Sequence, residues 1–550
     1  MSDAAELVDD RYRWVALANT TAAVFMSALD GSIVLIALPP IFRGIHLDPL
    51  APGSIGYLLW MIMGYRLVQA VLVVSVGRLG DMYGRVKIYN AGFVVFTLAS
   101  ILLSFDPFTR GGGATWLIGW RVLQAVGGSM LMANSAAILT DAFPASRRGF
   151  ALGINQVAAL AGQFVGLVAG GLLASLDWRA VFWINVPIGL FGTVWAYRKL
   201  RETGDRKPGR IDVAGNLLFA LGLGALLLGV TEGVQPYHGH AMGWTNPAVI
   251  VELVGGLVAL VAFVVVERRT PDPMFDLRLF AIRSFSAGNA AGLAVSLVRG
   301  GLQFILVIWL QGIWLPLHGY HFSQTPLWSG VFLLPMTLGM LLAGPVSGYL
   351  SDRFGSRRLA TSGLAVFGAS LVGLLLLPVD FSYTPFALLI VANGIGGGMF
   401  AAPNTSSIMG AVPANQRGEA SGMRATFLNS GTALSIGVFF SIMIAGLARH
   451  LPRALVSGLT RHGVAPAAAA HVAALPPVAS LFATLLGVNP VAHLLGAARA
   501  GVSDVVTSPA FFARMLVAPF GDGLSPVLWV AIGLTALAAL ASALREPDGR

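Results

Sequence analysis

Cysteine is absent from the 550 residues of this chain, and charged residues are scarce. Without cysteine the protein can form no disulfide, no thiolate metal site and no cysteine nucleophile. Charged residues make up 11% of the sequence, whereas ~25% is usual for soluble domains. Because so few charges cannot solvate the surface of a globule of this length, the composition excludes a soluble multidomain protein.

Apolar residues take the place of the missing charges: they make up 56% of the chain, and the mean hydropathy is +0.76. One helical span needs ~20 such residues. Runs of this length are separated by short charged or Pro/Gly-rich breaks. The sequence therefore predicts an all-α membrane protein with fourteen transmembrane helices and excludes a single-span receptor. The predicted spans are 14–38, 55–76, 87–104, 115–140, 149–174, 178–198, 213–233, 247–266, 284–312, 325–350, 358–378, 384–411, 418–446 and 525–545.

Lysine is also rare, since arginine supplies 32 of the 35 basic residues, and the positions of these residues predict the orientation. With the N-terminus in the cytoplasm, 23 basic residues fall on inner segments and 8 on outer ones. Cytoplasmic loops of membrane proteins carry this excess. We therefore expect a multi-pass protein of the cytoplasmic membrane with both termini in the cytoplasm. The net charge of +10 then reflects topology and not nucleic-acid binding.

The nine histidines all fall on the expected outer side. The pairs His238/His240 and His318/His321 have the spacing of metal ligands, but no carboxylate converges on either pair. We interpret them as solvated loop residues and expect no metal site.

One outer connection, 447–524, is far longer than the others. It is rich in Ala, Leu, Val and Pro, with pieces of helix length between the prolines. We expect an extracellular helical cap, with an amphipathic segment in the membrane interface as the alternative. The apolar stretch 472–495 is a weak candidate for a further span because Pro476, Pro477 and Pro490 interrupt it.

A carboxylate, Asp30, lies near the middle of the first predicted span. An ionisable group at that depth costs ~3 kcal/mol or more, which makes it a functional candidate. Burial disfavours the charged form of a carboxylate, as a proton-binding site requires. Arg121 in the fourth span is the expected counter-charge and Gln124 the expected hydrogen-bond partner. The alternatives are a purely structural ion pair for Asp30 and snorkelling for Arg66 and Arg424; Glu232 is a candidate second coupling site.

Two short loops share the frame Gly-x-Leu-x-Asp-x-x-Gly: residues 77–87 read GRLGDMYGRVK, and residues 348–358 read GYLSDRFGSRR. Glycines permit a sharp turn, and Asp against Arg offers charge pairs that can break and reform. An internal repeat at equivalent places in two halves is typical of transporters. The candidate gate residues are Gly77, Gly80, Asp81, Gly84 and Arg85 in the first loop and Asp352 and Arg357 in the second.

The chain resembles the major facilitator superfamily, and within it the drug:proton antiporters with fourteen spans. The resemblance covers the chain except for the 447–524 insertion. It rests on residues 29–39, the loop 77–87, residues 121–127, Gly162, Gly166, Gly170 and Gly171, and residues 177–187, 212–215, 232–233, 243–244, 267–269 and 277–280.

The resemblance implies two six-helix bundles, 1–198 and 284–550, with two additional central helices and their linkers at 199–283. It makes Asp30 and Arg121 the proton-coupling pair. It places Asp81 and Arg85 in a cytoplasmic latch that has Asp141 as its acidic partner, and it makes the glycines of the fifth span a helix-packing motif. Leu167 stands where this motif usually has a proline that is associated with export, and Ala125 replaces a glycine.

We therefore expect a proton-coupled multidrug efflux antiporter that exports amphipathic small molecules and confers antibiotic resistance. The expected partners are a lipophilic substrate, cationic if the cavity is apolar with one or two carboxylates, together with protons and the bilayer. We expect a monomer that binds no nucleic acid, uses no cofactor and is not an enzyme. The alternatives are a dedicated exporter of one endogenous metabolite, lipid or antibiotic, and a proton symporter. A membrane enzyme is disfavoured because it would need a His/Asp/Glu cluster, which the sequence does not suggest. A static scaffold is disfavoured because it would have no use for charge pairs that can break and reform.

Overall fold

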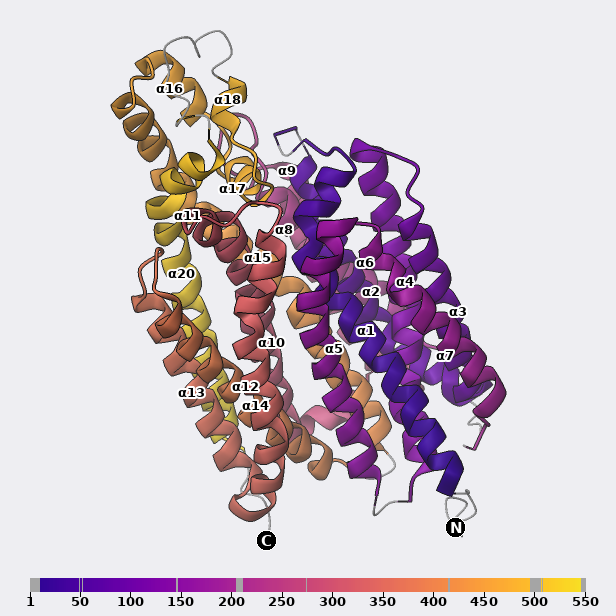
Figure 1. Cartoon of the computed structure of the whole chain (residues 1–550). Coiled ribbons are helices and arrows are strands. Elements are labelled where there is room, and N and C mark those ends of the chain that lie inside the picture. The colour runs from indigo at the N-terminus through magenta and orange to yellow at the C-terminus, as the bar shows by residue number, and fades with distance from the viewer. Residues whose placement is uncertain are drawn as a thin grey trace.

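The computed structural model describes residues 10–545 except 49, 52, 145–146, 204–210, 274, 414–415, 495–505 and 507. Within these residues, fourteen helices or helix series are long and apolar enough to cross a membrane, which confirms the predicted number of spans. All but two of them form two bundles that stand side by side (Figure 1).

The first bundle contains six spans. Helix α1 packs against α5, α4 and α7, while α4 also packs against α2 and α3. The helices are α1 (Asp10–Gly44), α2 (Ser54–Tyr83), α3 (Arg85–Ser104), α4 (Arg110–Ala142), α5 (Arg148–Leu176), and the series α6 (Ala180–Trp183) and α7 (Asn185–Lys199).

The second bundle also contains six spans and follows the short 3₁₀ helix η1 (Leu277–Ala281). Its first span includes a π-helical turn, η2, which is an uncommon geometry frequently found at functional sites. The helices are α10 (Arg283–Ile308) with η2 (Trp309–Trp314) and α11 (Leu315–Leu317), then α12 (Thr325–Phe354), α13 (Ser356–Leu376), α14 (Tyr383–Ala411), α15 (Arg417–Arg461) and α20 (Pro509–Ala543).

The remaining two spans, α8 (Val213–Gly233) and α9 (Pro247–Glu267), are central in chain order and peripheral in space. The side chain of Asp212 caps α8, and that of Asn246 caps α9. Helix α8 packs against α2 and α15, one from each bundle, and α9 packs on α8. The apolar side chains of α9 are largely exposed, including Val251, Val254 and Leu257. Such a surface is suited to lipid.

The long insertion forms a helical cap on one end of the molecule. Helix α15 runs on to Arg461 and α20 already begins at Pro509, so both helices extend well beyond the spans predicted for them. Between them lie α16 (Pro466–Ala473), α17 (Pro477–Leu485) and α18 (Pro490–Leu494). Helices α16 and α17 together are apolar enough for a span, but they meet at a bend of 87°.

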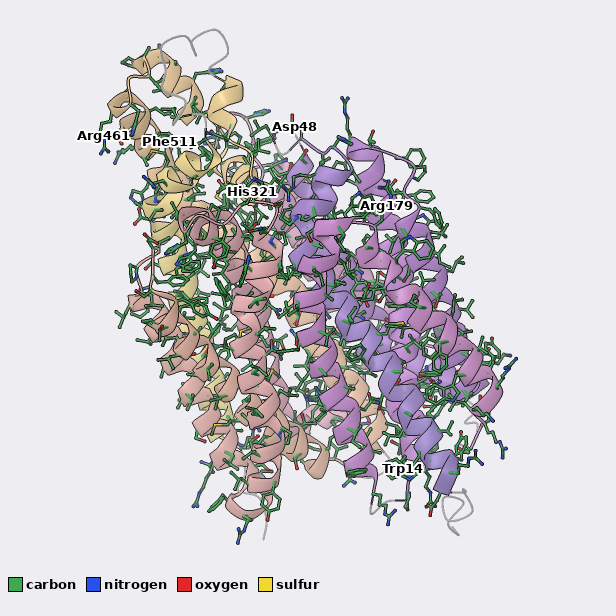
Figure 2. All side chains as sticks on the ribbon, in the orientation of Figure 1. Trp14, Asp48, Arg179, His321, Arg461 and Phe511 are labelled. Atoms are coloured by element: carbon green, nitrogen blue, oxygen red, sulfur yellow. The ribbon has the colours of Figure 1, made fainter. Side chains whose placement is uncertain are left out.

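The cap lies opposite the end at which α1 begins and α20 ends (Figure 1). We call the end with α16–α18 the cap face and the opposite end the terminal face. Arg461 and Phe511 lie in the cap, whereas Trp14 lies near the terminal face (Figure 2). Every residue of α17 is buried, so this part of the insertion is packed against protein and does not present an amphipathic face to lipid.

The two bundles are closed against each other toward the cap face. All residues of α1 from Ser32 to Phe42 are buried, and so are all residues from Phe304 to Pro316 in the other bundle. Gln311 of η2 donates a hydrogen bond of 3.2 Å to the carbonyl of Ile36 across this seam. A helix segment that is buried on every side can face neither lipid nor an open cavity, so the path toward the cap face is shut.

Candidate transport site

Asp30 of α1 lies in the interior of the first bundle and is fully buried. Its Oδ2 is 2.5 Å from Nη1 of Arg121 on α4, and both side chains are almost inaccessible. Its Oδ1 accepts hydrogen bonds from Gln124 (3.0 Å) and from Asn185 of α7 (2.8 Å). The carboxylate of α1 is thus held by side chains of two other helices, α4 and α7, and Arg121 neutralises it within the bundle.

Other groups hold Arg121 and Gln124 in place. Arg121 donates to Oε1 of Gln124 at 2.7 Å, and its guanidinium lies 4.1 Å from the centre of the Tyr65 ring. Gln124 also donates to the hydroxyl of Ser100. The sequence predicted the Asp30–Arg121 contact and the role of Gln124. It did not predict the partners Asn185, Ser100 and Tyr65, and only the 177–187 stretch of the resemblance pointed toward Asn185.

Glu232, the candidate second coupling site, lies at the cap-side end of α8. Its charge acts on Glu252 of α9, and Glu252 Oε2 is buried without a hydrogen-bond partner. No contact among the described residues joins Glu232 to Asp30 or Arg121. The structure therefore places Glu232 in a separate acidic pair on the peripheral helices.

The candidate latch occupies the terminal face. Arg85, the first residue of α3, bonds Asp81 at 2.7 Å and Asp141 of α4 at 2.5 Å. Gly84 alone separates α2 from α3 and has φ 113°, a conformation that favours glycine. Gly77 and Gly80 lie on α2 against α4, where a Cβ on Gly80 would meet Asn134. The sequence-predicted residues of the first loop thus converge with Asp141.

The second loop repeats the backbone geometry of the first. Gly355 alone separates α12 from α13, with φ 88°. Its N–H donates to the carbonyl of Ser351 at 2.9 Å, just as the N–H of Gly84 donates to Gly80 at 2.9 Å. Arg357 lies in the first turn of α13, and Asp352 lies in α12. The side chain of Asp352 falls outside the described part of the structure.

The glycines of α5 allow two close helix contacts. A Cβ on Gly166 or Gly170 would lie 2.6 or 2.7 Å from a carbonyl oxygen of α1, and one on Gly162 would overlap the same helix. Gly171 instead contacts Leu327 of α12, in the other bundle. One face of α5 therefore packs within its own bundle, and Gly171 belongs to the seam between the bundles.

The two arginines for which snorkelling was an alternative, Arg66 and Arg424, are partly buried, and so is Arg299. The guanidinium of Arg66 on α2 lies against Gly31. Arg424 on α15 has a buried Nε without a hydrogen-bond partner. Arg299 of α10 donates to Oε1 of Gln163 on α5 at 3.0 Å, and this hydrogen bond crosses between the bundles. The guanidinium of Arg66 therefore contacts α1 of its own bundle, and snorkelling of Arg424 stays a prediction.

The histidines make local contacts. His318 stacks on Trp314, and His321 bonds Ser323. Within the described residues, no three His, Asp or Glu side chains gather as a metal site would require.

Comparison with known proteins identifies this architecture. The family model described as Major Facilitator Superfamily matches residues 20–436. The chain belongs to the major facilitator superfamily. The fourteen spans thus form a major facilitator fold, with two six-helix bundles and an additional helix pair. As a superfamily member the chain is a transporter and not an enzyme.

Three relatives illustrate the range of the superfamily near this chain. The riboflavin transporter RibZ of Clostridioides difficile is 31% identical, over 80% of this chain and 90% of its own length. The multidrug resistance protein Stp of Mycobacterium tuberculosis is 32% identical, over 83% and 81%. The tetracenomycin C resistance and export protein of Streptomyces glaucescens is 29% identical, over 98% and 93%.

A solved structure shares the fold. A bacterial homologue of the human lysosomal transporter Spinster, in an inward-facing and occupied conformation, aligns over 97% of both chains with a TM-score of 0.60 and 16% identity.

Proposed function

We propose that this protein is a proton-coupled antiporter that exports amphipathic small molecules across the cytoplasmic membrane, with its terminal face in the cytoplasm. The observation that carries the proposal is the buried Asp30–Arg121 pair, because a carboxylate sealed in a bundle is a group whose protonation changes helix packing. Two relatives that are named for drug resistance and export support the direction of transport.

The geometry suggests how a proton acts. While Asp30 is ionised, it holds Arg121 on α4 and Asn185 on α7. Protonation removes the attraction between Asp30 and Arg121 and frees the guanidinium, since a buried pair that loses one charge is strongly destabilised. Helices α1, α4 and α7 then shift relative to one another. This shift changes the shape of the first bundle and therefore its packing against the second bundle.

Both bundles contact the linker that precedes η1 near the terminal face, where a latch is expected. Arg78 donates to the carbonyls of Asp272 and Pro273 in the linker, and Glu419 of α15 accepts from the N–H of Asp276. Together with Arg85 and its two carboxylates, these polar contacts can break and reform in each cycle.

Purified protein in proteoliposomes tests the proposal. We expect amphipathic compounds added on the terminal side to displace protons from the protein into that side's buffer in a dose-dependent way, and an imposed proton gradient to drive the same compounds against their own gradient. Transport that is indifferent to the proton gradient for every transported compound contradicts the proposal.

The alternatives remain distinct outcomes of the same assay. RibZ, a relative named as a riboflavin transporter, supports the alternative of a dedicated transporter of one metabolite. A single accepted compound indicates a dedicated exporter, and uptake in the same direction as the proton indicates a symporter.

A further inference from the structure

The second bundle has an apolar groove on its outer surface, near the terminal face. Helices α12 and α13 both pack on α14, and together the three helices enclose a groove of about 290 Å³. Its lining includes Leu342, Val346 and Leu350 of α12, Leu359 of α13, and Ile395 and Met399 of α14. The hydroxyl of Ser347, the one polar side chain in the lining, already bonds the carbonyls of Gly344 and Gly398. The groove therefore suits an apolar guest.

The internal repeat shows that the same face is covered in the first bundle. Aligned on the shared frame of the two loops, Val71 of α2 corresponds to Leu342 of α12, and Ser75 corresponds to Val346. Helix α8 packs against α2, and its Asn216 accepts a hydrogen bond from Ser75. Val71 is only 7% exposed, whereas Leu342 is 69% exposed. Ser75 is 8% exposed, whereas Val346 is 59% exposed. The second bundle thus leaves open a face that a helix covers in the first.

Three arginines lie at the terminal end of this groove. Arg353 lies less than one turn beyond Leu350, on the face of α12 that lines the groove. Arg358 immediately precedes Leu359 in α13. Arg353 and Arg358 are exposed, and Arg357 is half-buried. None of the three arginines forms an ion pair within the part of the chain that the structure describes. Their positive charge is therefore available to a guest.

The first turn differs because α4 supplies it with a carboxylate. Met130 of α4 and Met399 of α14 occupy equivalent positions, since each would contact a Cβ placed on the facing glycine of α3 or α13. Counted from these methionines, the position of Asp141 in α4 is taken by Gly410 in α14. Asp141 binds Arg85 in the first turn. The second turn has more arginines and lacks the counterpart of this carboxylate.

These features favour a lipid with a negative headgroup over a second protein. An acyl chain is apolar and flexible, and clusters of basic residues beside a membrane span attract anionic headgroups. Two copies of the chain that met across this groove about a two-fold axis would bring their own arginines together at the same leaflet. Like charges oppose such a contact.

We propose that this groove binds an anionic phospholipid from the leaflet on the terminal side. One acyl chain lies between α12 and α13, and the phosphate is bound by Arg353 and Arg358, because the guanidinium fork matches phosphate oxygens. The phosphate supplies the negative charge that α14 does not provide at Gly410. This inference goes beyond the transport function proposed above and does not depend on it.

Photoactivatable lipids test the proposal. Purified protein is reconstituted in phosphatidylcholine nanodiscs that carry a small share of one probe, either phosphatidylglycerol or phosphatidylcholine, with the same photoreactive acyl chain. After illumination, mass spectrometry locates and quantifies the labelled residues. We expect the phosphatidylglycerol probe to label the groove residues of α12, α13 and α14 about tenfold more than the phosphatidylcholine probe, because the headgroup adds charge-assisted contacts.

A double variant tests the headgroup contacts. Arg353→Gln combined with Arg358→Gln should reduce labelling by phosphatidylglycerol to the level of phosphatidylcholine. Arg198→Gln combined with Lys199→Gln is the matched control, since it removes two exposed basic residues at the terminal end of α7. This control should be labelled as the parent is.

A second variant tests the acyl-chain contacts. Val346→Trp places a large side chain in the groove and should reduce groove labelling by both probes. Leu388→Trp is its control, because Leu388 of α14 is also exposed and does not line the groove.

Equal labelling by the two probes in the parent protein overturns the proposal, and this comparison decides even where a variant does not fold. Full labelling of the Arg353/Arg358 double variant by phosphatidylglycerol overturns it as well. If Val346→Trp changes the oligomeric state in size-exclusion chromatography and leaves the labelling unchanged, the groove is an interface between copies and the proposal is wrong. None of these experiments measures transport, so a failure of the proposed transport function leaves their outcome unaffected.

Discussion

At the scale of single residues, Asp30 connects charge to structure. Its carboxylate accepts hydrogen bonds from Arg121, Gln124 and Asn185, so a change in its protonation alters contacts with both α4 and α7. The sequence could reveal Asp30 and Arg121, because a charge within a long apolar run is conspicuous. It could not reveal Asn185 or Ser100, because an uncharged polar residue in a span has no comparable signal.

We expect Asp30→Asn to abolish gradient-driven accumulation and the pH dependence of substrate binding together, because asparagine is nearly isosteric but cannot titrate. Exchange of substrate without a gradient should persist. Counterflow and gradient-driven uptake in proteoliposomes measure the two activities separately. Asn185→Ala is the control: it loosens Asp30 but leaves it titratable, so pH dependence should remain. Uphill transport by Asp30→Asn would make Asp30 a structural carboxylate.

Gly171 provides a second residue-scale prediction, because its Cα faces the backbone of Leu327 in the opposite bundle. In Gly171→Ala the added methyl group overlaps that backbone, and overpacking of this kind costs about 1–3 kcal/mol. The cost falls on the state that is closed toward the cap face, so the protein should spend more time open there. Spin-label distances across the cap face measure this shift. Gly153→Ala in the same helix meets no neighbouring atom within 4 Å, and distances in this control should match the parent.

At the scale of elements, the sequence predicts helices well where a glycine or a charged turn ends them. The two loops with the shared frame are single-glycine turns, as their spacing suggested. The sequence did not predict the end of α15 or the start of α20, because an apolar pattern does not distinguish residues buried in the cap from residues in the membrane. Both helices continue beyond the predicted spans against the cap, and α15 accommodates Pro452 in its extension.

The latch is the element whose removal we expect to change the conformational balance. Asp81→Asn leaves Arg85 with Asp141 alone. Since Asp81 is partly exposed, its ion pair contributes modestly, ~1 kcal/mol or less, so the population ratio of the two states should change several-fold. Transport should fall, whereas folding and substrate binding survive. Spin labels across the terminal face report the shift, and an unchanged distance distribution with full transport would reduce this loop to a structural turn.

At the scale of the whole molecule, the charge distribution determines the orientation that we propose. The absence of native cysteine makes single-cysteine labelling direct. Ser457 lies on the extension of α15 at the cap face and is exposed, and Thr203 follows α7 at the terminal face. In sealed cells, Ser457→Cys should react with an impermeant maleimide and Thr203→Cys should react only after permeabilisation. Equal labelling in intact cells would contradict the orientation.

The sequence alone could predict the number of spans and the two halves, but not how the halves meet. Whether Arg66 faces water, lipid or another helix depends on which side of α2 lies in the seam, and periodicity within a uniformly apolar helix does not reveal this. The same limit applies to α8 and α9: α8 packs on α2 and α15, and α9 packs on α8.

The cap has a consequence for the balance between the open and closed states. Helix α17 is enclosed by both halves of the protein: Phe482 and the adjoining Leu486 line a small pocket with Phe42 and Leu58 of the first bundle, while α17 also packs on η2 of the second. The chain enters and leaves the cap through α15 and α20, so α17 is tethered to the second bundle, and opening toward the cap face must peel it away from the first. The apolar surface uncovered by this step, at ~25 cal/mol per Å², adds to the free energy of the state that is open toward the cap face. We therefore expect the insertion to favour the state that is closed toward the cap face.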